Sequence, residues 1–229
     1  RASQVSPPSQ AAATAPPISS KRIASVFTVP LLKSCRTGLT CAGRKGQAMD
    51  DGFWVFGYGS LMWAPEFPVA ESVIAQADGW RRSFCLRSIR HRGTEACPGL
   101  VLGLEPHPGR DCTGLALRVE DSLWPGVIAA IRARELVTEA YREALVPLAL
   151  ADGRRVEAVT YVMRPDHWQY AAGLSPDEQA AIIALACGGR GPNADYLYNT
   201  VAHLAQLGIP DDDLADLAAR VRALRDAAA

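Results

Sequence analysis

Phe53-Trp54-Val55-Phe56-Gly57-Tyr58-Gly59-Ser60-Leu61 is a short apolar run that ends in two glycines around a tyrosine. Four consecutive large apolar residues predict a fully buried strand, and the two glycines release the backbone into a turn. Successive N–H groups of such a turn can point the same way and hold an anion. The pattern is also typical of an ordinary buried strand that enters a glycine turn, so its interpretation depends on the rest of the chain.

The first 49 residues differ in composition from the rest of the chain. They contain no Asp or Glu, although 24 of the 229 residues are acidic. We therefore predict a disordered N-terminal extension over residues 1–48, outside the native fold, and a single domain over residues 49–229. Met49 favours a sequence upstream of the natural start, and a targeting or flexible arm is the alternative. The apolar stretch at residues 23–32 is shorter than the roughly 20 residues that span a bilayer, so we expect no membrane helix.

Charge and cysteine use limit the partners of this domain. Residues 50–229 carry 17 Arg and 24 acidic residues, a formal charge of about −7, which argues against nucleic acid or an anionic membrane as the partner. The six Cys include no Cys-x-x-Cys pair and follow no secretory signal, which is typical of cytosolic thiols. The four His are scattered, so we expect no catalytic metal. These patterns predict a cytoplasmic protein with no evident obligate protein partner.

Several apolar segments separated by turn residues predict an antiparallel sheet. Residues 72–87 are expected to form a strand pair or one long bent strand, broken near Asp78-Gly79. Residues 100–105 and 112–119 are predicted as two further strands, joined by the turn-rich Pro106-His107-Pro108-Gly109. Residues 141–150 and 156–163 are also predicted as strands.

One helix is predicted between the strands, and the other helix signals lie in the last third of the chain. Asp121 is expected to cap one helix that is inserted between strands and runs to about Arg134. Ser175 and Glu178 form a capping-box pattern that starts a second helix, ending near Gly188. Two more helices are predicted at residues 193–207 and 211–225. Strands with one inserted helix, followed by about three helices, predict an α+β domain.

Four separated blocks of sequence carry a family resemblance. They are residues 55–63, His91-Arg92-Gly93 with Pro98-Gly99-Leu100, residues 134–138 with Tyr141-Arg142, and Gly191-Pro192-Asn193 with Asp195-Tyr196-Leu197. In this order the chain from Phe53 to about Arg225 resembles the ChaC family of γ-glutamylcyclotransferases, which break glutathione into 5-oxoproline and cysteinylglycine. The resemblance implies that the mixed, largely antiparallel sheet closes into a small β-barrel. It also implies a lyase that uses no cofactor and takes glutathione as its small-molecule substrate.

The reaction of a γ-glutamyl compound requires proton transfer more than it requires a nucleophile from the protein. The α-amine and the γ-carbonyl belong to the same molecule, so the enzyme must hold the chain folded and move protons. One carboxylate can deprotonate the amine and protonate the leaving nitrogen. Glu135 matches the family's general acid/base, although an acid beside Arg134 is also typical of a solvated surface charge. Glu139 is a second candidate, whose charge would raise the pKa of Glu135.

The remaining candidate residues would bind the substrate. The backbone of the turn within Val55, Phe56, Gly57, Tyr58, Gly59, Ser60 and Leu61 is expected to hold the glutamyl α-carboxylate or the oxyanion. Tyr196 matches a family tyrosine that would contact the glutamyl group, or it fills core space as an ordinary helix residue. His91 and Arg92 are candidates for the glycine carboxylate. Because most of these residues recognise only the glutamyl group, other γ-glutamyl peptides or amines are an alternative substrate class, and a non-catalytic binding or regulatory protein is another.

Overall fold

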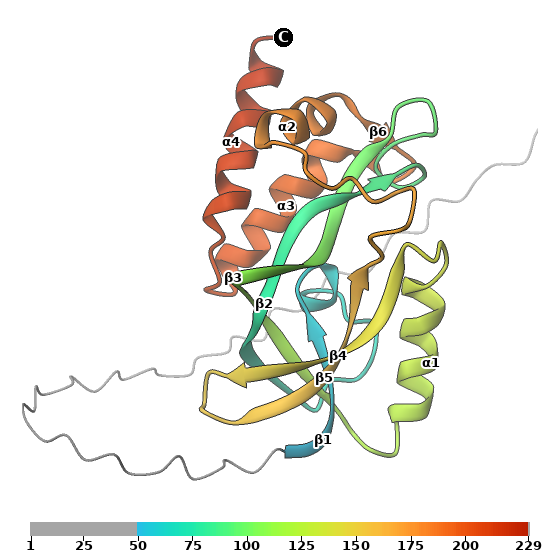
Figure 1. The fold of residues 1–229 in the computed structure, drawn as a ribbon, viewed down its shortest axis with the longest axis vertical. Helices are drawn as coiled ribbons and strands as arrows, with labels where there is room; N and C mark the ends of the chain where they lie inside the picture. Colours follow the sequence, from blue (N-terminus) through green and yellow to red (C-terminus); the bar gives the residue numbers. More distant parts are fainter. Residues whose placement is uncertain (1–49, 229) are drawn as a thin grey trace, which may run out of the picture. The chain divides into compact units, whose positions relative to one another are not determined.

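A closed five-stranded β-barrel forms the lower half of the fold in Figure 1. The computed structural model describes residues 50–228, and the predicted extension over residues 1–48 lies outside them. The strands follow the order β1-β3-β2-β4-β5 around the barrel, and every pair is antiparallel except β1 with β5. Their bounds are β1 (Asp50–Gly57), β2 (Glu71–Ser88), β3 (Gly99–Val119), β4 (Tyr141–Leu150) and β5 (Arg155–Met163). The predicted α+β class with a small mixed barrel is confirmed.

Strand β1 is buried because it has a neighbour on each side. Val55 pairs with Leu117 of β3 and with Val159 of β5, and both Val55 and Phe56 have no exposed surface. The strand predicted from the apolar run is therefore confirmed, but its full burial is not: Trp54, Val55 and Phe56 are buried, whereas Phe53 is 39% exposed and stacks on Trp124. The strand leads directly into the turn at Tyr58-Gly59 and a short 3₁₀ helix, η1 (Ser60–Met62).

Strand β3 runs without interruption through the turn that the sequence predicts at Pro106–Gly109. That prediction is wrong, because the pairing with β2 resumes on both sides: Asp111 lies opposite Asp78, and Pro106 lies opposite Trp80. Gly79 of β2 alone lies opposite the four residues 107–110 of β3. The segment with the prolines and the glycine therefore forms a large bulge in β3 and not a hairpin turn. Gly79 and Gly109 adopt positive φ angles of 80° and 82°, which glycine allows at little cost. The resulting long β2–β3 pair reaches from the barrel to the C-terminal helices (Figure 1).

Four α-helices accompany the barrel within the described residues: α1 (Trp124–Glu135) between β3 and β4, then α2 (Pro176–Leu185), α3 (Asn193–Gln206) and α4 (Asp212–Asp226). The capping box of Ser175 and Glu178 at the start of α2 is confirmed. Asp121 does not cap α1, because the N–H groups of Leu123 and Trp124 bond to the Glu120 carbonyl and place Asp121 in the turn before the helix. Helix α2 ends at Leu185, before the predicted Gly188, because β6 (Cys187–Gly188) pairs with β7 (Gly191–Pro192).

Asn193 attaches the C-terminal helices to the barrel. It is the first residue of α3, and its side chain is completely buried. The Leu100 N–H donates to Asn193 Oδ1 at 2.6 Å, and Asn193 Nδ2 donates to the Leu100 carbonyl at 2.7 Å. Both backbone groups of one residue of β3 are thus paired by one amide, which fixes α3 at the barrel mouth.

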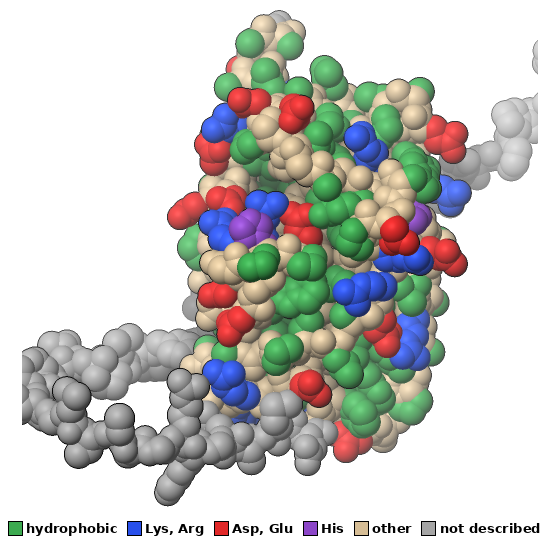
Figure 2. Space-filling view, viewed as in Figure 1, with side chains coloured by type: hydrophobic (Ala, Val, Ile, Leu, Met, Phe, Trp, Pro, Cys, Tyr) green, Lys and Arg blue, Asp and Glu red, His purple; other side chains and the backbone are tan. Residues whose placement is uncertain are grey.

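The surface in Figure 2 carries acidic and basic side chains close together, with apolar side chains between them. This face offers no broad area of one charge sign. None of the helices within residues 50–228 combines the length and the apolar composition needed to cross a membrane.

Candidate active site

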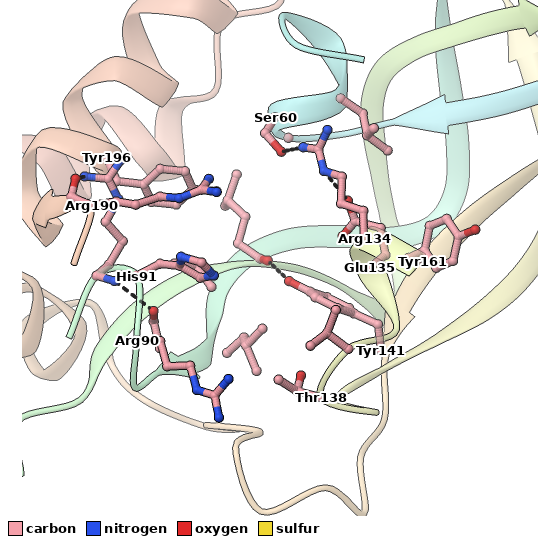
Figure 3. Close-up of a pocket in the computed structure, with 18 of the residues that line it drawn as sticks. Ser60, Arg90, His91, Arg134, Glu135, Thr138, Tyr141, Tyr161, Arg190 and Tyr196 are labelled. Carbon is pink, nitrogen blue, oxygen red and sulfur yellow. Dashed lines mark hydrogen bonds and ion pairs between the residues drawn. The ribbon is translucent and has the colours of Figure 1, made fainter. Parts of the chain in front are cut away.

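A cavity of about 580 Å³ lies where the separated sequence blocks meet. The turn after β1 contributes Tyr58 and Ser60, the end of α1 contributes Glu135, the loop after β2 contributes His91, and α3 contributes Tyr196. Figure 3 shows Ser60, Arg134 and Glu135 on one side of the cavity and Arg90, His91, Arg190 and Tyr196 on the other. Residues that are more than 100 positions apart in the sequence therefore surround one space.

Glu135 is a largely buried carboxylate at the end of α1. Its side chain is 19% exposed, and Arg134 Nε lies 3.1 Å from its Oε1. Burial raises the pKa of Glu135, the neighbouring Arg134 opposes this rise, and the charge of Glu66 adds to it. A carboxylate whose pKa is raised toward neutrality is better matched to take up and return a proton near physiological pH.

Arg134 connects this carboxylate with the glycine turn. Besides its contact with Glu135, its Nη2 donates to Ser60 Oγ at 2.9 Å and its Nη1 donates to the Ala64 carbonyl at 3.0 Å. Glu66 Oε2 lies 3.2 Å from the same Nη1. The guanidinium therefore holds the carboxylate and the turn in a fixed relation. Arg134 belongs to the family block at residues 134–138, and its position next to Glu135 is the sequence signal for this role.

Glu139 lies away from the cavity. It is exposed, has a left-handed φ of 57°, and is absent from the cavity lining. Its charge acts on Arg164, and the acid that raises the pKa of Glu135 is Glu66. The expectation that Glu139 tunes Glu135 is therefore corrected: a second carboxylate is present, but it comes from the loop after η1.

The glycine turn faces the cavity with only part of the predicted segment. Tyr58, Gly59, Ser60 and Leu61 line the space, whereas Val55, Phe56 and Gly57 do not. The 3₁₀ bonds begin with the Met62 N–H, which donates to the Gly59 carbonyl. The N–H groups of Ser60 and Leu61 precede that bond and, like the first N–H groups of any helix, have no acceptor within the turn.

Four tyrosines also line the cavity. The hydroxyl of Tyr58 donates to the Tyr161 carbonyl at 2.8 Å, and that of Tyr141 donates to the Leu102 carbonyl at 2.5 Å. Tyr196 packs edge-on against Phe84, and burial raises its pKa to about 12. Burial also raises the pKa of the other three phenols, so all four stay protonated. Tyr141 and Tyr161 are not among the site residues predicted from the sequence, although both line the cavity.

Basic side chains surround the other end of the cavity. Arg90, His91, Arg92 and Arg190 all line it, and both residues that the sequence predicts here, His91 and Arg92, are among them. Burial, and then the charges of Arg190, Arg90 and Arg92, lower the pKa of His91. Within residues 50–228, no group of three or more His, Cys, Asp or Glu is arranged to hold a metal ion.

Several known proteins are similar to this chain. The model of the family described as ChaC-like protein matches residues 53–224. A glutathione-specific gamma-glutamylcyclotransferase from Escherichia coli (strain K12) is 39% identical over 75% of this chain and 73% of its own length. The human protein named glutathione-specific gamma-glutamylcyclotransferase 1 is 35% identical over 75% of this chain and 78% of its own length.

A crystal structure of a yeast gamma-glutamyl cyclotransferase specific to glutathione has the same fold. It superimposes with a TM-score of 0.68 at 23% identity, covering 77% of this chain and 98% of the yeast chain. The extent of the family match and the identity to the bacterial and human relatives lead to one conclusion. The chain belongs to the ChaC-like protein family.

Proposed function

We propose that this protein cleaves glutathione into 5-oxoproline and cysteinylglycine, as a lyase without a covalent enzyme intermediate. The observation that carries the proposal is Glu135, a largely buried carboxylate with a raised pKa that faces a cavity built from the family's separated motifs. The names of the bacterial and human relatives support the choice of substrate.

The reaction needs one group that first accepts and then donates a proton. The carboxylate of Glu135 takes a proton from the substrate's α-ammonium, and the freed amine nitrogen attacks the γ-carbonyl carbon. The bond between that carbon and the cysteinyl nitrogen then breaks, while Glu135 returns the proton to the leaving nitrogen. The nitrogen that is now in the ring gives up its second proton to the released amine, which departs as an ammonium and leaves a neutral lactam. Because both reacting groups belong to one molecule, holding the glutamyl chain in a bent form supplies much of the rate acceleration.

The glycine turn is the proposed holder of the glutamyl group. The N–H groups of Ser60 and Leu61 would donate to the α-carboxylate or to the oxyanion that forms on the γ-carbonyl. The α-carboxylate and the α-amine share one carbon atom, so the turn and the base must stay close together. Arg134 contacts both Ser60 and Glu135 and keeps that spacing. Tyr196 would form part of the wall against the glutamyl chain.

Substrate choice is the first testable consequence. Reduced glutathione should release 5-oxoproline with a kcat/KM at least about tenfold above that of γ-glutamyl-alanine, because the smaller peptide lacks the thiol and the glycine that fill the rest of the cavity. Comparable kcat/KM values for the two peptides would mean that the protein acts on γ-glutamyl peptides or amines in general. Binding of glutathione without any release of 5-oxoproline would favour a non-catalytic binding or regulatory protein.

A second prediction concerns pH. Glu66→Gln should move the acid limb of the kcat/KM profile to lower pH. The charge of Glu66 raises the pKa of Glu135, so its removal lets Glu135 stay ionised, and thus active as a base, in more acidic solution. The measurement is the rate of 5-oxoproline release across pH for the wild type and the variant, since kcat/KM reports ionisation of the free enzyme. A limb that stays in place or moves to higher pH would contradict the assignment of Glu135.

The proposal also includes where the protein acts and what it binds. The net negative charge of residues 50–229 and the cysteine pattern support a cytoplasmic enzyme that acts on a small molecule, without nucleic acid, membrane or an obligate protein partner. The proposed reaction itself requires no cofactor, because the substrate supplies both nucleophile and electrophile.

A further inference from the structure

Arg82 of β2 is a buried cation that contacts the glycine turn from outside the cavity. Its side chain is 3% exposed and is not part of the cavity lining. Its Nη1 donates to the Tyr58 carbonyl at 2.7 Å, its Nη2 donates to the Thr113 carbonyl, and its Nε lies 3.0 Å from Asp211 Oδ2. One guanidinium therefore joins the turn after β1, strand β3 and the residue that precedes α4.

Arg82 also replaces the strand pairing that β1 does not complete. The pairing of β1 with β3 ends at Gly57, and Gly59 would lie opposite Thr113 if the pairing continued. The chain turns into η1 instead, and Arg82 donates to the carbonyls of Tyr58 and Thr113. A buried carbonyl without a donor is costly, so this side chain fixes the direction of the Tyr58 carbonyl.

The direction of that carbonyl determines where the next N–H points. The Tyr58–Gly59 peptide is trans, so its carbonyl oxygen and its amide hydrogen point in opposite directions. The Gly59 N–H is therefore directed away from Arg82, on the side where Gly59 lines the cavity. No hydrogen bond between described residues engages this N–H. It forms one row with the N–H groups of Ser60 and Leu61.

We propose that Arg82 is a positioning residue for the reaction, which keeps the Gly59 N–H in the cavity as a donor to the anionic part of the substrate. The inference rests on the proposed function and adds a donor to the glycine turn, together with the residue that orients it. A donor that is fixed in advance stabilises a carboxylate or an oxyanion without reorganisation during the reaction. The guanidinium also polarises the peptide that it binds, because hydrogen bonds in a chain strengthen one another.

Asp211 holds Arg82 in this orientation. Its Oδ2 contacts Arg82 Nε, while its Oδ1 accepts the Leu214 N–H at 3.1 Å and caps α4. A second arginine, Arg134, donates to Ser60 of the same turn, as Figure 3 shows. The turn is therefore fixed by two arginines, of which only Arg134 lines the cavity.

The test compares variants that loosen the contact with the turn and a variant that loosens α4. Arg82→Lys keeps the charge and the stem, but one ammonium cannot replace a planar fork that reaches three acceptors. Asp211→Asn keeps an oxygen that can cap α4 and removes the charge paired with Arg82, so it serves if the lysine variant does not fold. Leu217→Ala is the control, because it truncates a buried side chain of α4 that does not line the cavity.

Release of 5-oxoproline from glutathione measures the effect on the reaction. Arg82→Lys should lower kcat/KM about 10- to 100-fold, because a preorganised donor to an oxyanion is typically worth about 10² to 10³ in rate. Asp211→Asn should lower it about three- to tenfold, because Arg82 keeps both carbonyl contacts. Leu217→Ala should stay within about twofold of the wild type, although its melting temperature falls.

A single resonance reports on the turn directly. Tyr58-Gly59 is the only Tyr-Gly step in the sequence, so protein made with carbonyl-¹³C tyrosine and ¹⁵N glycine gives one signal for a labelled peptide pair. The probe is 5-oxoproline, because it carries the former glutamyl carboxylate and is not turned over. At equal saturation, measured by calorimetry, it should shift the Gly59 N–H signal in the wild type and in Leu217→Ala, but much less in Arg82→Lys.

Three results would overturn the positioning role of Arg82. Wild-type kcat/KM in both Arg82→Lys and Asp211→Asn would show that the reaction does not depend on this contact. An equal loss of kcat/KM in Leu217→Ala would show that loosening α4 is enough to explain the effect. A Gly59 signal that responds equally in the wild type and in Arg82→Lys would show that the arginine does not orient this N–H.

The proposed function is tested separately by the wild type. If the wild type binds 5-oxoproline and Arg82→Lys loses the Gly59 response, but no 5-oxoproline is released from glutathione, the reaction is wrong and the placement of the Gly59 N–H by Arg82 stands. If the wild type neither binds 5-oxoproline nor cleaves glutathione, both proposals are wrong.

Discussion

Glu135→Gln is expected to lower kcat for 5-oxoproline release by about 10⁴-fold, while glutathione still binds. General acid–base steps are typically worth about 10² to 10⁴ in rate, and Glu135 is proposed to act once as the base and once as the acid. The amide has nearly the same shape and can still hydrogen-bond, but it cannot take up or return the proton. Rate measurements with saturating glutathione, together with calorimetric binding, separate loss of chemistry from loss of affinity.

The fold should not suffer from this change. Burial raises the pKa of Glu135 in the folded protein, so its contribution to stability is present at acid pH and is lost as the pH rises through the folded value. At neutral pH a neutral glutamine therefore removes no stabilising charge, and the melting temperature should stay at or above that of the wild type. Loss of activity together with a lower melting temperature would point to misfolding instead of missing chemistry.

Glu139→Gln is the matched control, because it makes the same chemical change four residues later. Glu139 is exposed and does not line the cavity, so its replacement should change kcat by well under tenfold. If Glu135→Gln keeps more than about a tenth of the rate while Glu139→Gln is inactive, the base is wrongly assigned. If both variants stay active, proton transfer by a carboxylate is not how the protein works.

The elements that local patterns specify were predictable from the sequence. The run at residues 53–56 forms a strand that is buried from Trp54 onward, and Ser175 and Glu178 cap α2 as expected, because both signals depend on residues that are neighbours in the chain. Closure of the barrel depends on the parallel pairing of β1 with β5, about 100 residues apart, which leaves no local signal. The turn predicted at residues 106–109 was wrong for the same reason. Whether this segment forms a turn or a bulge depends on how it pairs with β2, which the local sequence does not show.

The residues of the candidate site were also only partly predictable from the sequence. Tyr58, Glu135, His91 and Tyr196 reach one cavity, because the family resemblance already contains the long-range folding information that spacing lacks. Glu139 was misplaced because its distance from Glu135 along the chain says nothing of its direction once α1 has ended. Glu66 was missed because it gains its importance from a partner in another segment, Arg134.

Asn193→Asp is expected to destabilise the protein by about 3 kcal/mol at neutral pH. One carboxylate oxygen can still accept the Leu100 N–H, but the other replaces a donor that lies 2.7 Å from the Leu100 carbonyl, so two acceptors would face each other in a buried site. For a domain of this size each kcal/mol lowers the melting temperature by about 2–4 °C, so thermal unfolding should show a drop of roughly 6–12 °C. Asn199→Asp is the control, because it makes the same change at an exposed position of the same helix.

The pH dependence distinguishes a lost hydrogen bond from a general disturbance of α3. When the introduced carboxyl is protonated, it regains an O–H that can donate to the Leu100 carbonyl. Burial beside an acceptor should raise the folded-state pKa of that carboxyl above its unfolded value, so its favourable contribution is present at acid pH and is lost as the pH rises through the folded value. The gap in melting temperature between the variant and the wild type should therefore shrink as the pH falls. A gap that stays constant with pH, or that equals the gap of the Asn199 control, would mean that the paired amide bonds do not hold the helices to the barrel.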